Sequence, residues 1–155
     1  PIRVCHNDPK ISNFIFDSQL NAICIIDLDT LMPTTILNDI SDSIRSLCVS
    51  ETEDESNLKK IFFKYDYFDC FIESYFSINK TNLNYYEINN ISLSIELIFL
   101  EQGIRFLTDF LNGNIYFNVD YEEQNLVRAT NQIFLSNQVF KNKKELDSII
   151  RKYAK

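Results

Sequence analysis

Glycine is scarce in this chain, which has two glycines among its 155 residues. Neither lies in a glycine-rich loop ahead of a helix, the arrangement in which backbone N–H groups surround the phosphates of a nucleotide. Only five residues precede His6, which leaves no room upstream of it for a lysine-bearing β-strand. The chain therefore lacks the parts with which a nucleotide-binding lobe holds phosphates. The opening Pro1, in place of Met, fits a segment of a longer protein.

Excess positive charge is also missing, because the formal net charge of the chain is −7. Binding to a nucleic-acid backbone needs a basic surface, so we expect no nucleic-acid partner. No apolar run approaches the length of a membrane-spanning helix, and no signal-peptide pattern opens the chain. We therefore expect no membrane partner either.

The cysteines contain no CxxC pair and are widely spaced along the chain, at Cys5, Cys24, Cys48 and Cys70. Three of them lie in apolar or aromatic surroundings, which favours free, mostly buried thiols over the alternatives of a disulfide framework or a metal site. Free thiols are typical of a reducing compartment, so we expect a cytoplasmic location.

The length and a hydrophobic content of 45% suit one packed domain, and we find no linker or internal repeat. Two short β-branched and aromatic runs separated by a polar turn predict a β-hairpin over 14–16 and 22–26. Apolar periodicity predicts helices over 36–49, 58–77, 85–111, 124–140 and 143–153. In the second helix, five aromatic residues at helical spacing predict a core stripe: Phe62, Phe63, Tyr67, Phe71 and Tyr75. The expected fold class is α+β and mostly helical.

The strongest chemical signal is an aspartate, Asp8, followed by Asn13 five residues later and by Asp27 beyond the predicted hairpin. Kinases carry an Asp, an Asn and a second Asp in this order and at these separations. The first carboxylate accepts the proton of the attacking hydroxyl, while the amide oxygen and the second carboxylate hold Mg²⁺ against the nucleotide phosphates. Lys10 can place an ammonium near the transferred phosphoryl group. The competing interpretation is a surface turn followed by an ordinary hairpin.

Other polar residues near this motif have structural interpretations. We expect the His6 ring to hold the loop through a backbone hydrogen bond, rather than to transfer a proton. Asp39 and Asp42 open a predicted helix, where carboxylates commonly cap and are favoured by the helix dipole. Arg45 can pair with either of them. The acidic run over 50–57 is typical of a solvated loop, with a cation site as the alternative.

Three stretches carry a resemblance to a known family. The first holds His6-Asn7-Asp8 with Lys10 and Asn13. The second runs from Ile26 through Asp29-Thr30, Met32-Pro33 and Asn38-Asp39 to Ile44-Arg45. The third runs from Arg105 through Asp109, Gly113, Tyr116-Phe117 and Asn125 to Asn131-Gln132. Over residues 6 to about 135, the chain resembles the aminoglycoside phosphotransferase/choline kinase superfamily, and within it the bacterial N-acetylhexosamine 1-kinases. The first stretch is superfamily-wide, whereas the other two are narrower.

The resemblance implies a role for each matching residue. Asp8 would be the catalytic base, and Asn13 and Asp27 would be metal ligands. Asp29 would lie beside the metal or the sugar, and Arg105 and Tyr116 would contact the sugar.

The sequence departs from the family pattern at four places, none of which removes a catalytic group. Pro9 replaces the usual Thr, Ser12 a common second Asn, Thr34 a frequent Gly, and Ile40-Ser41 a typical Phe-Gly. These departures affect the expected substrate preference more than the reaction type.

The resemblance also implies a fold and an activity. Residues 1–155 would be the C-terminal lobe of a protein-kinase-like fold with a catalytic-loop hairpin, and the N-terminal nucleotide-binding lobe would be absent from the chain. The implied reaction is ATP- and Mg²⁺-dependent phosphorylation of the anomeric hydroxyl of an N-acetylhexosamine. Two alternatives stay open: a related kinase acting on choline, an aminoglycoside or homoserine, and a non-enzymatic remnant used as a binding module. We expect the chain alone to be inactive and to self-associate through the apolar surface that faces the absent lobe.

Overall fold

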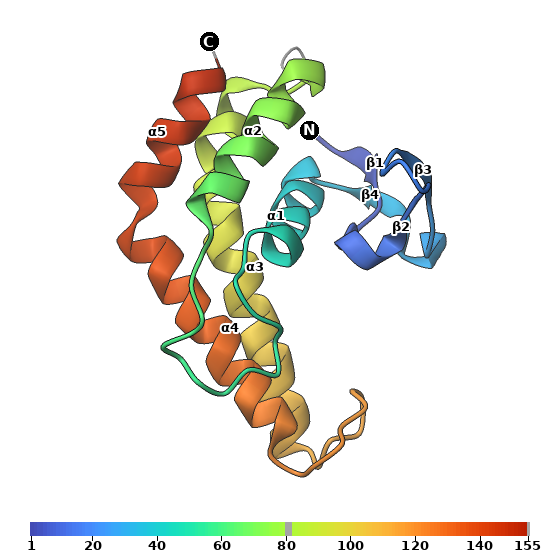
Figure 1. Ribbon diagram of the computed structural model, residues 1–155, viewed down its shortest axis with the longest axis vertical. Helices are drawn as coiled ribbons and strands as arrows, with labels where there is room; N and C mark the ends of the chain where they lie inside the picture. The colour runs from blue at the N-terminus through green and yellow to red at the C-terminus, as the bar shows by residue number, and fades with distance from the viewer. Residues whose placement is uncertain (80–81, 155) are drawn as a thin grey trace.

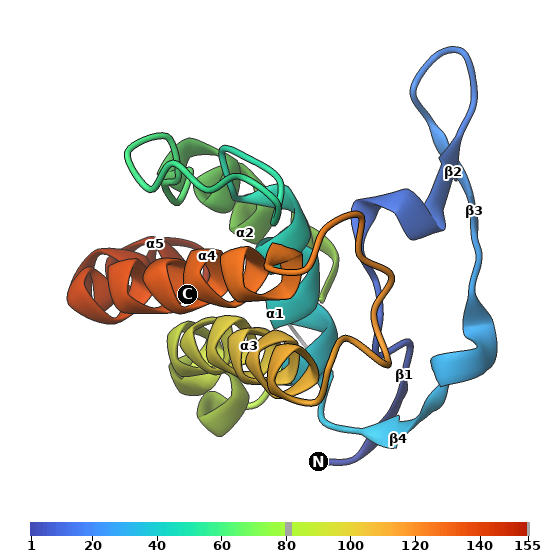
Figure 2. The same ribbon diagram turned by 90° about the horizontal axis from the view of Figure 1, so that it is seen from below.

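The computed structural model describes residues 1–79 and 82–154 and is built on two long antiparallel helices. These are α3 (Tyr85–Leu111) and α4 (Gln124–Lys141), and they make the most extensive contact between any two elements. In Figure 1, α2 (Tyr65–Asn79) and α5 (Lys143–Tyr153) lie beside their upper half, and α1 (Ile36–Leu47) crosses in front of α3. All strands lie on the far side of α1 (Figure 2). The expected mostly helical α+β class is confirmed.

The strands form two separate antiparallel pairs. β1 (Arg3–Cys5) pairs with β4 (Met32–Thr34), and β2 (Phe14–Phe16) pairs with β3 (Ala22–Ile25) in a register that joins Phe14 to Ile25. The second pair is the hairpin predicted over 14–16 and 22–26, one residue shorter. The first pair was not predicted, because its strands are three residues long and lie far apart in the sequence.

The start of α3 shows why its predicted range of 85–111 is confirmed. The Asn84 side chain accepts from the Glu87 backbone N–H at 2.9 Å, and the Glu87 carboxylate accepts from the Asn84 N–H at 2.8 Å. This capping box satisfies two helix N–H groups that would otherwise lack partners. Arg3 pairs with the same Glu87 carboxylate, so β1 is tied to the first turn of α3. The helix ends at Leu111 with Asn112 as its C-cap, and Gly113 follows with a φ of 87°.

The core lies between the helices and is almost wholly aliphatic and aromatic. Its fully buried side chains come from every helix, and the largest are Phe68, Phe99, Ile40, Ile44, Ile72, Ile91, Ile95, Leu135 and Leu146. No helix in the described part of the chain is both long enough and apolar enough to cross a membrane.

The predicted second helix is wrong at its start, since α2 begins at Tyr65 rather than near residue 58. Residues 61–63 are extended instead. Phe63 forms a β-bridge with Val49, and the Gln138 side chain binds the Phe63 N–H at 3.1 Å and the Ile61 carbonyl at 2.9 Å. A partly buried amide from α4 thus satisfies backbone groups that a helix would have satisfied internally.

The predicted aromatic stripe is also partly wrong, because Phe62 and Tyr67 are each 51% exposed. The face of α2 that packs in the core is Phe68, Ile72 and Phe76, one residue further along the helix. A smaller difference concerns the end of α1, which lies at Leu47 rather than near 49.

Gly103 lies at a close approach of α3 to α4. A Cβ at this position would lie 2.7 Å from Cγ1 of Ile133 and 3.3 Å from the carbonyl oxygen of Ala129. The second neighbour is backbone and cannot rotate away. The interhelical distance therefore depends on the missing side chain.

Gly103→Ala should destabilise the protein by about 1–3 kcal/mol, the usual cost of overpacking, although alanine is the better helix former. Thermal or urea unfolding measures the effect, with Thr108→Ala on the exposed side of α3 as the control. Adding Ile133→Ala removes the nearest clashing atom, so the two substitutions should couple favourably in a double-mutant cycle. A Gly103→Ala protein as stable as the parent would contradict the close approach.

Candidate active site

The loop between β1 and the hairpin brings three predicted catalytic residues into contact. The Asn13 amide donates to the carbonyl oxygen of Asp8 at 2.8 Å and to its carboxylate Oδ2 at 3.0 Å. The Lys10 ammonium lies 2.6 Å from the same Oδ2. Asn13 is buried at the end of a short 3₁₀ turn, η1 (Ile11–Asn13), so its rotamer is fixed by its surroundings. Asp8 is thus held in one orientation from two sides.

The His6 ring supports the loop as predicted. The Asp8 backbone N–H donates to Nδ1 of His6 at 3.3 Å, so Nδ1 carries no proton in this arrangement. Nε2 then carries the proton and donates to the Ile26 carbonyl oxygen at 3.0 Å. Both ring nitrogens are engaged, and the neutral ring joins the loop to the end of the hairpin.

Asp39 supports the site differently from the helix capping proposed for it. The N-cap of α1 is Thr35, whose side chain accepts from Leu37 N–H at 3.4 Å. The Asp39 carboxylate reaches across to the loop instead, where Oδ2 and Oδ1 accept from the backbone N–H groups of His6 and Asn7, each at 2.8 Å. Asn7 has a φ of 66°, a left-handed conformation that asparagine tolerates better than most residues. The carboxylate therefore fixes the turn that leads into Asp8.

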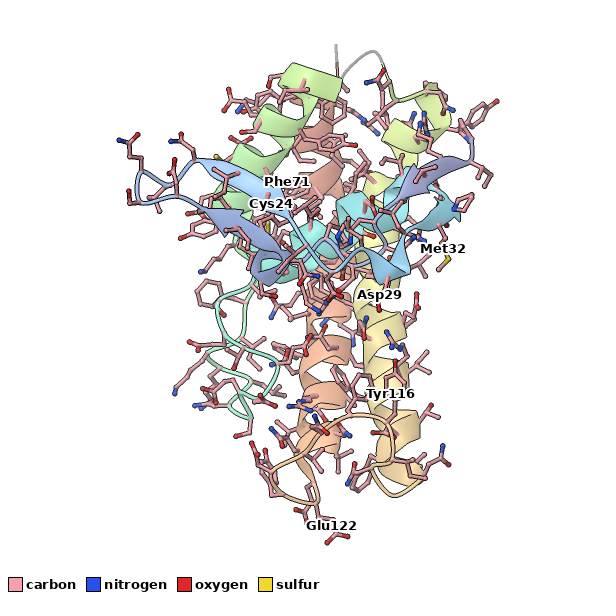
Figure 3. All side chains as sticks on the ribbon, turned by 90° about the vertical axis from the view of Figure 1, so that its right-hand side faces the viewer. Cys24, Asp29, Met32, Phe71, Tyr116 and Glu122 are labelled. Atoms are coloured by element: carbon pink, nitrogen blue, oxygen red, sulfur yellow. The ribbon has the colours of Figure 1, made fainter. Side chains whose placement is uncertain are left out.

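The hairpin returns Asp27 beside the catalytic loop. The Ile26 N–H donates to the Asn13 carbonyl oxygen at 2.9 Å, which places the next residue, Asp27, at the end of η1. A hydrogen bond with Asp29 and the Asp29 charge, with some desolvation and the charge of Asp8, raise the pKa of Asp27, while Lys10 acts against them. Negative charge therefore accumulates here. Asp29 lies in η2 (Leu28–Thr30), on the face shown in Figure 3.

Asn13 and Asp27 offer oxygen ligands of the kind that Mg²⁺ prefers. Because the Asn13 amide nitrogen faces Asp8, its oxygen is turned away from it, and Asp27 adds a carboxylate whose raised pKa reflects uncompensated negative charge. Mg²⁺ prefers oxygen ligands and is commonly held by one or two carboxylates plus substrate phosphates. Over residues 1–79 and 82–154 there is no group of three or more His, Cys, Asp and Glu side chains arranged for a metal, which a site completed by phosphates does not require.

A groove of about 1100 Å³ runs from the catalytic loop to the lower ends of α3 and α4. Five of the predicted site residues line it: Asp8, Lys10, Arg45, Arg105 and Tyr116. Asn13, Asp27 and Asp29 lie outside its lining, as do His6 and Asp39. The groove therefore joins the predicted base to the predicted acceptor contacts, and the predicted metal ligands are not part of its lining.

Arg105 and Tyr116 lie together in the groove wall, although α3 and the loop after it are far in sequence from Asp8. The Arg105 guanidinium carbon is 5.9 Å from the Tyr116 ring centre and 5.5 Å from that of Phe117, which are cation–π distances. Among the described residues Arg105 forms no salt bridge, contrary to the usual role of an arginine on a helix surface. Tyr116 is 74% exposed, so simple packing does not explain it.

Arg45 is a buried part of the groove wall. Its guanidinium pairs with Asp42 at 2.8 Å and with Glu53, and its side chain is 11% exposed. Burial opposes the charge, but these two carboxylates outweigh it and raise the pKa of Arg45. Arg45 therefore fastens the acidic loop over 50–57 to α1. The prediction that this loop is simply solvated is therefore wrong, because Asp54 also pairs with Arg128 at 2.6 Å.

The cysteines offer no further site. All four are free; Cys5 and Cys48 are buried, whereas Cys24 and Cys70 are exposed, so the expectation of free thiols is confirmed and that of mostly buried ones only in part. Burial raises the pKa of the Cys48 thiol to about 12, which keeps it protonated.

Asp109 was assigned no role from the sequence, although its carboxylate accepts four hydrogen bonds. It is buried near the end of α3 and accepts hydrogen bonds from the backbone of residues 115–117 and from the Asn125 side chain. An acidic residue in the last turn of a helix is unfavourable for the helix dipole, and that is the signal that could have identified it.

Comparison with known families adds one finding. Residues 1–66 match the model of the phosphotransferase enzyme family, a range that takes in the catalytic loop, both strand pairs and α1. The match covers less than half of the chain and does not reach residues 105–132, so it does not test the resemblance expected there. It supports the aminoglycoside phosphotransferase superfamily for this chain, and phosphoryl transfer in general as its chemistry.

Proposed function

We propose that this chain is the acceptor-binding and catalytic lobe of a kinase that phosphorylates a sugar hydroxyl, in particular the anomeric hydroxyl of an N-acetylhexosamine. The observation that carries the proposal is the placement of Asp8. Its carboxylate is held by Lys10 and Asn13 at one end of a groove whose walls include Arg105 and Tyr116. An acceptor in contact with those walls lies in the same cavity as the base.

The residues divide the reaction between them. Asp8 orients the acceptor hydroxyl and accepts its proton, and since phosphoryl transfer passes through a loose transition state, orientation contributes much of the effect. Lys10 offsets charge on the transferred group. A magnesium ion, held by Asn13 and Asp27 with Asp29 beside them, would neutralise charge on the nucleotide phosphates.

The charge of the groove bears on the acceptor. Carboxylates outnumber cations in its lining, with Asp8, Asp42, Glu51, Glu53, Asp54 and Glu101 against Lys10, Arg45, Arg105 and Arg128. Three of the cations are already paired, Lys10 with Asp8, Arg45 with Asp42 and Glu53, and Arg128 with Asp54. An anionic acceptor would be disfavoured, whereas a neutral sugar is compatible, with Arg105 left to donate to its hydroxyl or acetamido oxygens. A panel of N-acetylhexosamines, choline, aminoglycosides and homoserine tests the acceptor directly.

This chain offers few groups that could bind the phosphates of a nucleotide. Its two glycines lie within α3 and directly after it, so neither can form a phosphate-binding loop. We therefore assign ATP binding to a further lobe that would cover the strands, where many large apolar side chains are exposed: Ile2, Val4, Leu20, Ile23, Leu28 and Met32. We keep the cytoplasm as the proposed location, because the free thiols suit a reducing compartment.

Asp8→Asn should remove nearly all turnover while leaving thermal unfolding close to that of the parent. Sugar 1-phosphate formation is measured in a protein that carries both lobes. Glu122→Gln is the control, since this carboxylate lies at the far tip of the molecule (Figure 3). If Asp8→Asn kept more than about a tenth of kcat, which is under ~1.4 kcal/mol of barrier, Asp8 would not be the base.

Asp27→Ala should weaken the Mg²⁺ dependence of the same reaction more than Asn13→Ala does, because a carboxylate brings formal charge to a hard cation. The measurement is activity against Mg²⁺ concentration. Asp17→Asn, in the turn of the same hairpin, controls for damage to the hairpin itself. An unchanged Mg²⁺ response in Asp27→Ala would mean that the hairpin does not deliver this carboxylate to the metal.

The 155-residue chain alone should fold but phosphorylate nothing, and it should self-associate through the exposed apolar side chains on its strands. Circular dichroism, the kinase assay and the solution mass test these three statements. Turnover by the chain alone would contradict the assignment of ATP binding to another lobe. A strictly monomeric chain would count against the apolar face as a docking surface.

A further inference from the structure

Asp109 is placed where a helix does not favour a carboxylate. It lies two residues before the last residue of α3, Leu111, where the carbonyl end of the helix carries partial negative charge. Its side chain is 6% exposed and forms no salt bridge within residues 1–79 and 82–154. A buried anion at this position needs strong compensation, and four N–H donors provide it.

Three of these donors are consecutive backbone N–H groups in the loop between α3 and α4. Oδ1 accepts from Ile115 at 3.0 Å and from Tyr116 at 2.8 Å, and Oδ2 accepts from Phe117 at 2.9 Å. Residues 115–117 belong to no helix or strand, so their N–H groups have no ladder to join. Burial raises the pKa of Asp109, but the bonds from Phe117, Tyr116 and Ile115 outweigh it and lower the pKa below its ordinary value.

The fourth donor ties the loop to α4. Asn125 is fully buried, and its amide donates to Oδ2 of Asp109 at 2.9 Å and to the side-chain oxygen of Asn114 at 3.0 Å. Asn114 in turn donates to the Glu122 carbonyl oxygen at 2.9 Å. The loop is thus fixed near its beginning and its end, with Asp109 as the shared acceptor.

What this network holds in place is the aromatic wall of the groove. We use this name for Phe106, Tyr116 and Phe117, all of which line the cavity. The ring centres of Tyr116 and Phe117 are 4.8 Å apart, and those of Phe106 and Phe117 are 4.6 Å apart. The wall is preorganised before any ligand enters, with one broad ring, that of Tyr116, turned to solvent.

We propose that Asp109 is a positioning residue for the acceptor: by binding the N–H groups of residues 115–117, it holds the aromatic wall, and so Tyr116, in the orientation in which an acceptor sugar is bound. This inference rests on the proposed function. A flexible wall would lose free energy on ordering when it binds a ligand, and the carboxylate removes that loss in advance. Asp109 touches no substrate itself, and its effect passes entirely through the backbone.

The test uses the absence of tryptophan from the chain. Tyr116→Trp introduces a single indole at the wall, and the same background carries either Asp109→Asn or the control Asp120→Asn, an exposed aspartate in the same loop. Asparagine keeps the shape of the side chain but replaces one carboxylate oxygen by an amide NH2 group. That group is a donor and cannot accept from the two N–H donors that face it. Hydrogen exchange at residues 115–117, normalised for global stability, should rise on the order of tenfold in Asp109→Asn and stay unchanged in Asp120→Asn.

The effect on the acceptor is read from indole fluorescence during titration with N-acetylglucosamine. Asp109→Asn should weaken the apparent affinity by about tenfold, whereas Asp120→Asn should leave it unchanged. Adding Asn125→Asp restores an amide–carboxylate pair with the roles exchanged, and we expect it to recover part of both the protection and the affinity.

The outcomes test separately whether Asp109 holds the aromatic wall and whether that wall binds the acceptor. Equal exchange in Asp109→Asn and Asp120→Asn overturns the claim that Asp109 holds the wall. Faster exchange with unchanged sugar affinity overturns its role in acceptor binding. A flat titration in the Tyr116→Trp protein, with Asp109 intact, counts against a sugar acceptor and so against the proposed function, while the exchange comparison still decides whether Asp109 orders residues 115–117.

Discussion

The contact on which the site depends is the one between the Asp39 carboxylate and two consecutive backbone N–H groups, those of His6 and Asn7. It joins α1, which is part of the helical core, to the loop that carries Asp8. Ser43 and Ser46 of α1 also bind this loop, at Pro9 and Ile11, but the Asp39 contact is the one made with the left-handed residue Asn7 itself. The His6 ring then extends the connection to Ile26, so the helix, the loop and the return strand of the hairpin form one unit.

A carboxylate that accepts from several backbone N–H groups also fixes two other irregular segments. Asp17 accepts from the N–H groups of Gln19 and Asn21 in the hairpin turn, and Asp109 accepts from three consecutive N–H groups after α3. A chain with two glycines has few positions where a turn can relax into unusual backbone angles. Carboxylates that bind successive N–H groups fix such turns in a different way, and they use the acidic residues that this chain has in excess.

Sequence reasoning succeeded where one local signal decided the structure. The α3 helix, with its capping box at Asn84 and Glu87 and its end at Gly113, follows from short-range rules, and so does the β2–β3 hairpin. It failed where a distant residue intervened. Gln138 of α4 keeps residues 61–63 extended, and Arg3 reaches the start of α3 from the other end of the sequence. No window of neighbouring residues contains those partners.

In the candidate site, too, the features set by local sequence were predicted and those set by distant partners were not. The spacing of Asp8, Asn13 and Asp27 was readable because one loop and one hairpin carry all three, and the structure places Asp8 in direct contact with Asn13. Asp39 was expected to support the site, and it does so through the His6 and Asn7 N–H groups rather than as a helix cap, the role that the dipole suggests for a carboxylate in the first turn. Asp109 was given no role, since the backbone groups that it binds belong to residues 115–117, beyond the end of its own helix.

The arrangement of the groove also constrains how the proposed reaction would be assembled. Asp8 and Lys10 line the groove, whereas Asn13 and Asp27 lie outside its lining, so Asp8 stands between the predicted acceptor side and the predicted metal side. An acceptor held against the aromatic wall would approach Asp8 from within the groove, and phosphates held by the metal would approach from the hairpin. In-line transfer needs the attacking and leaving oxygens on opposite sides of the phosphorus, and two separate entry sides meet that requirement.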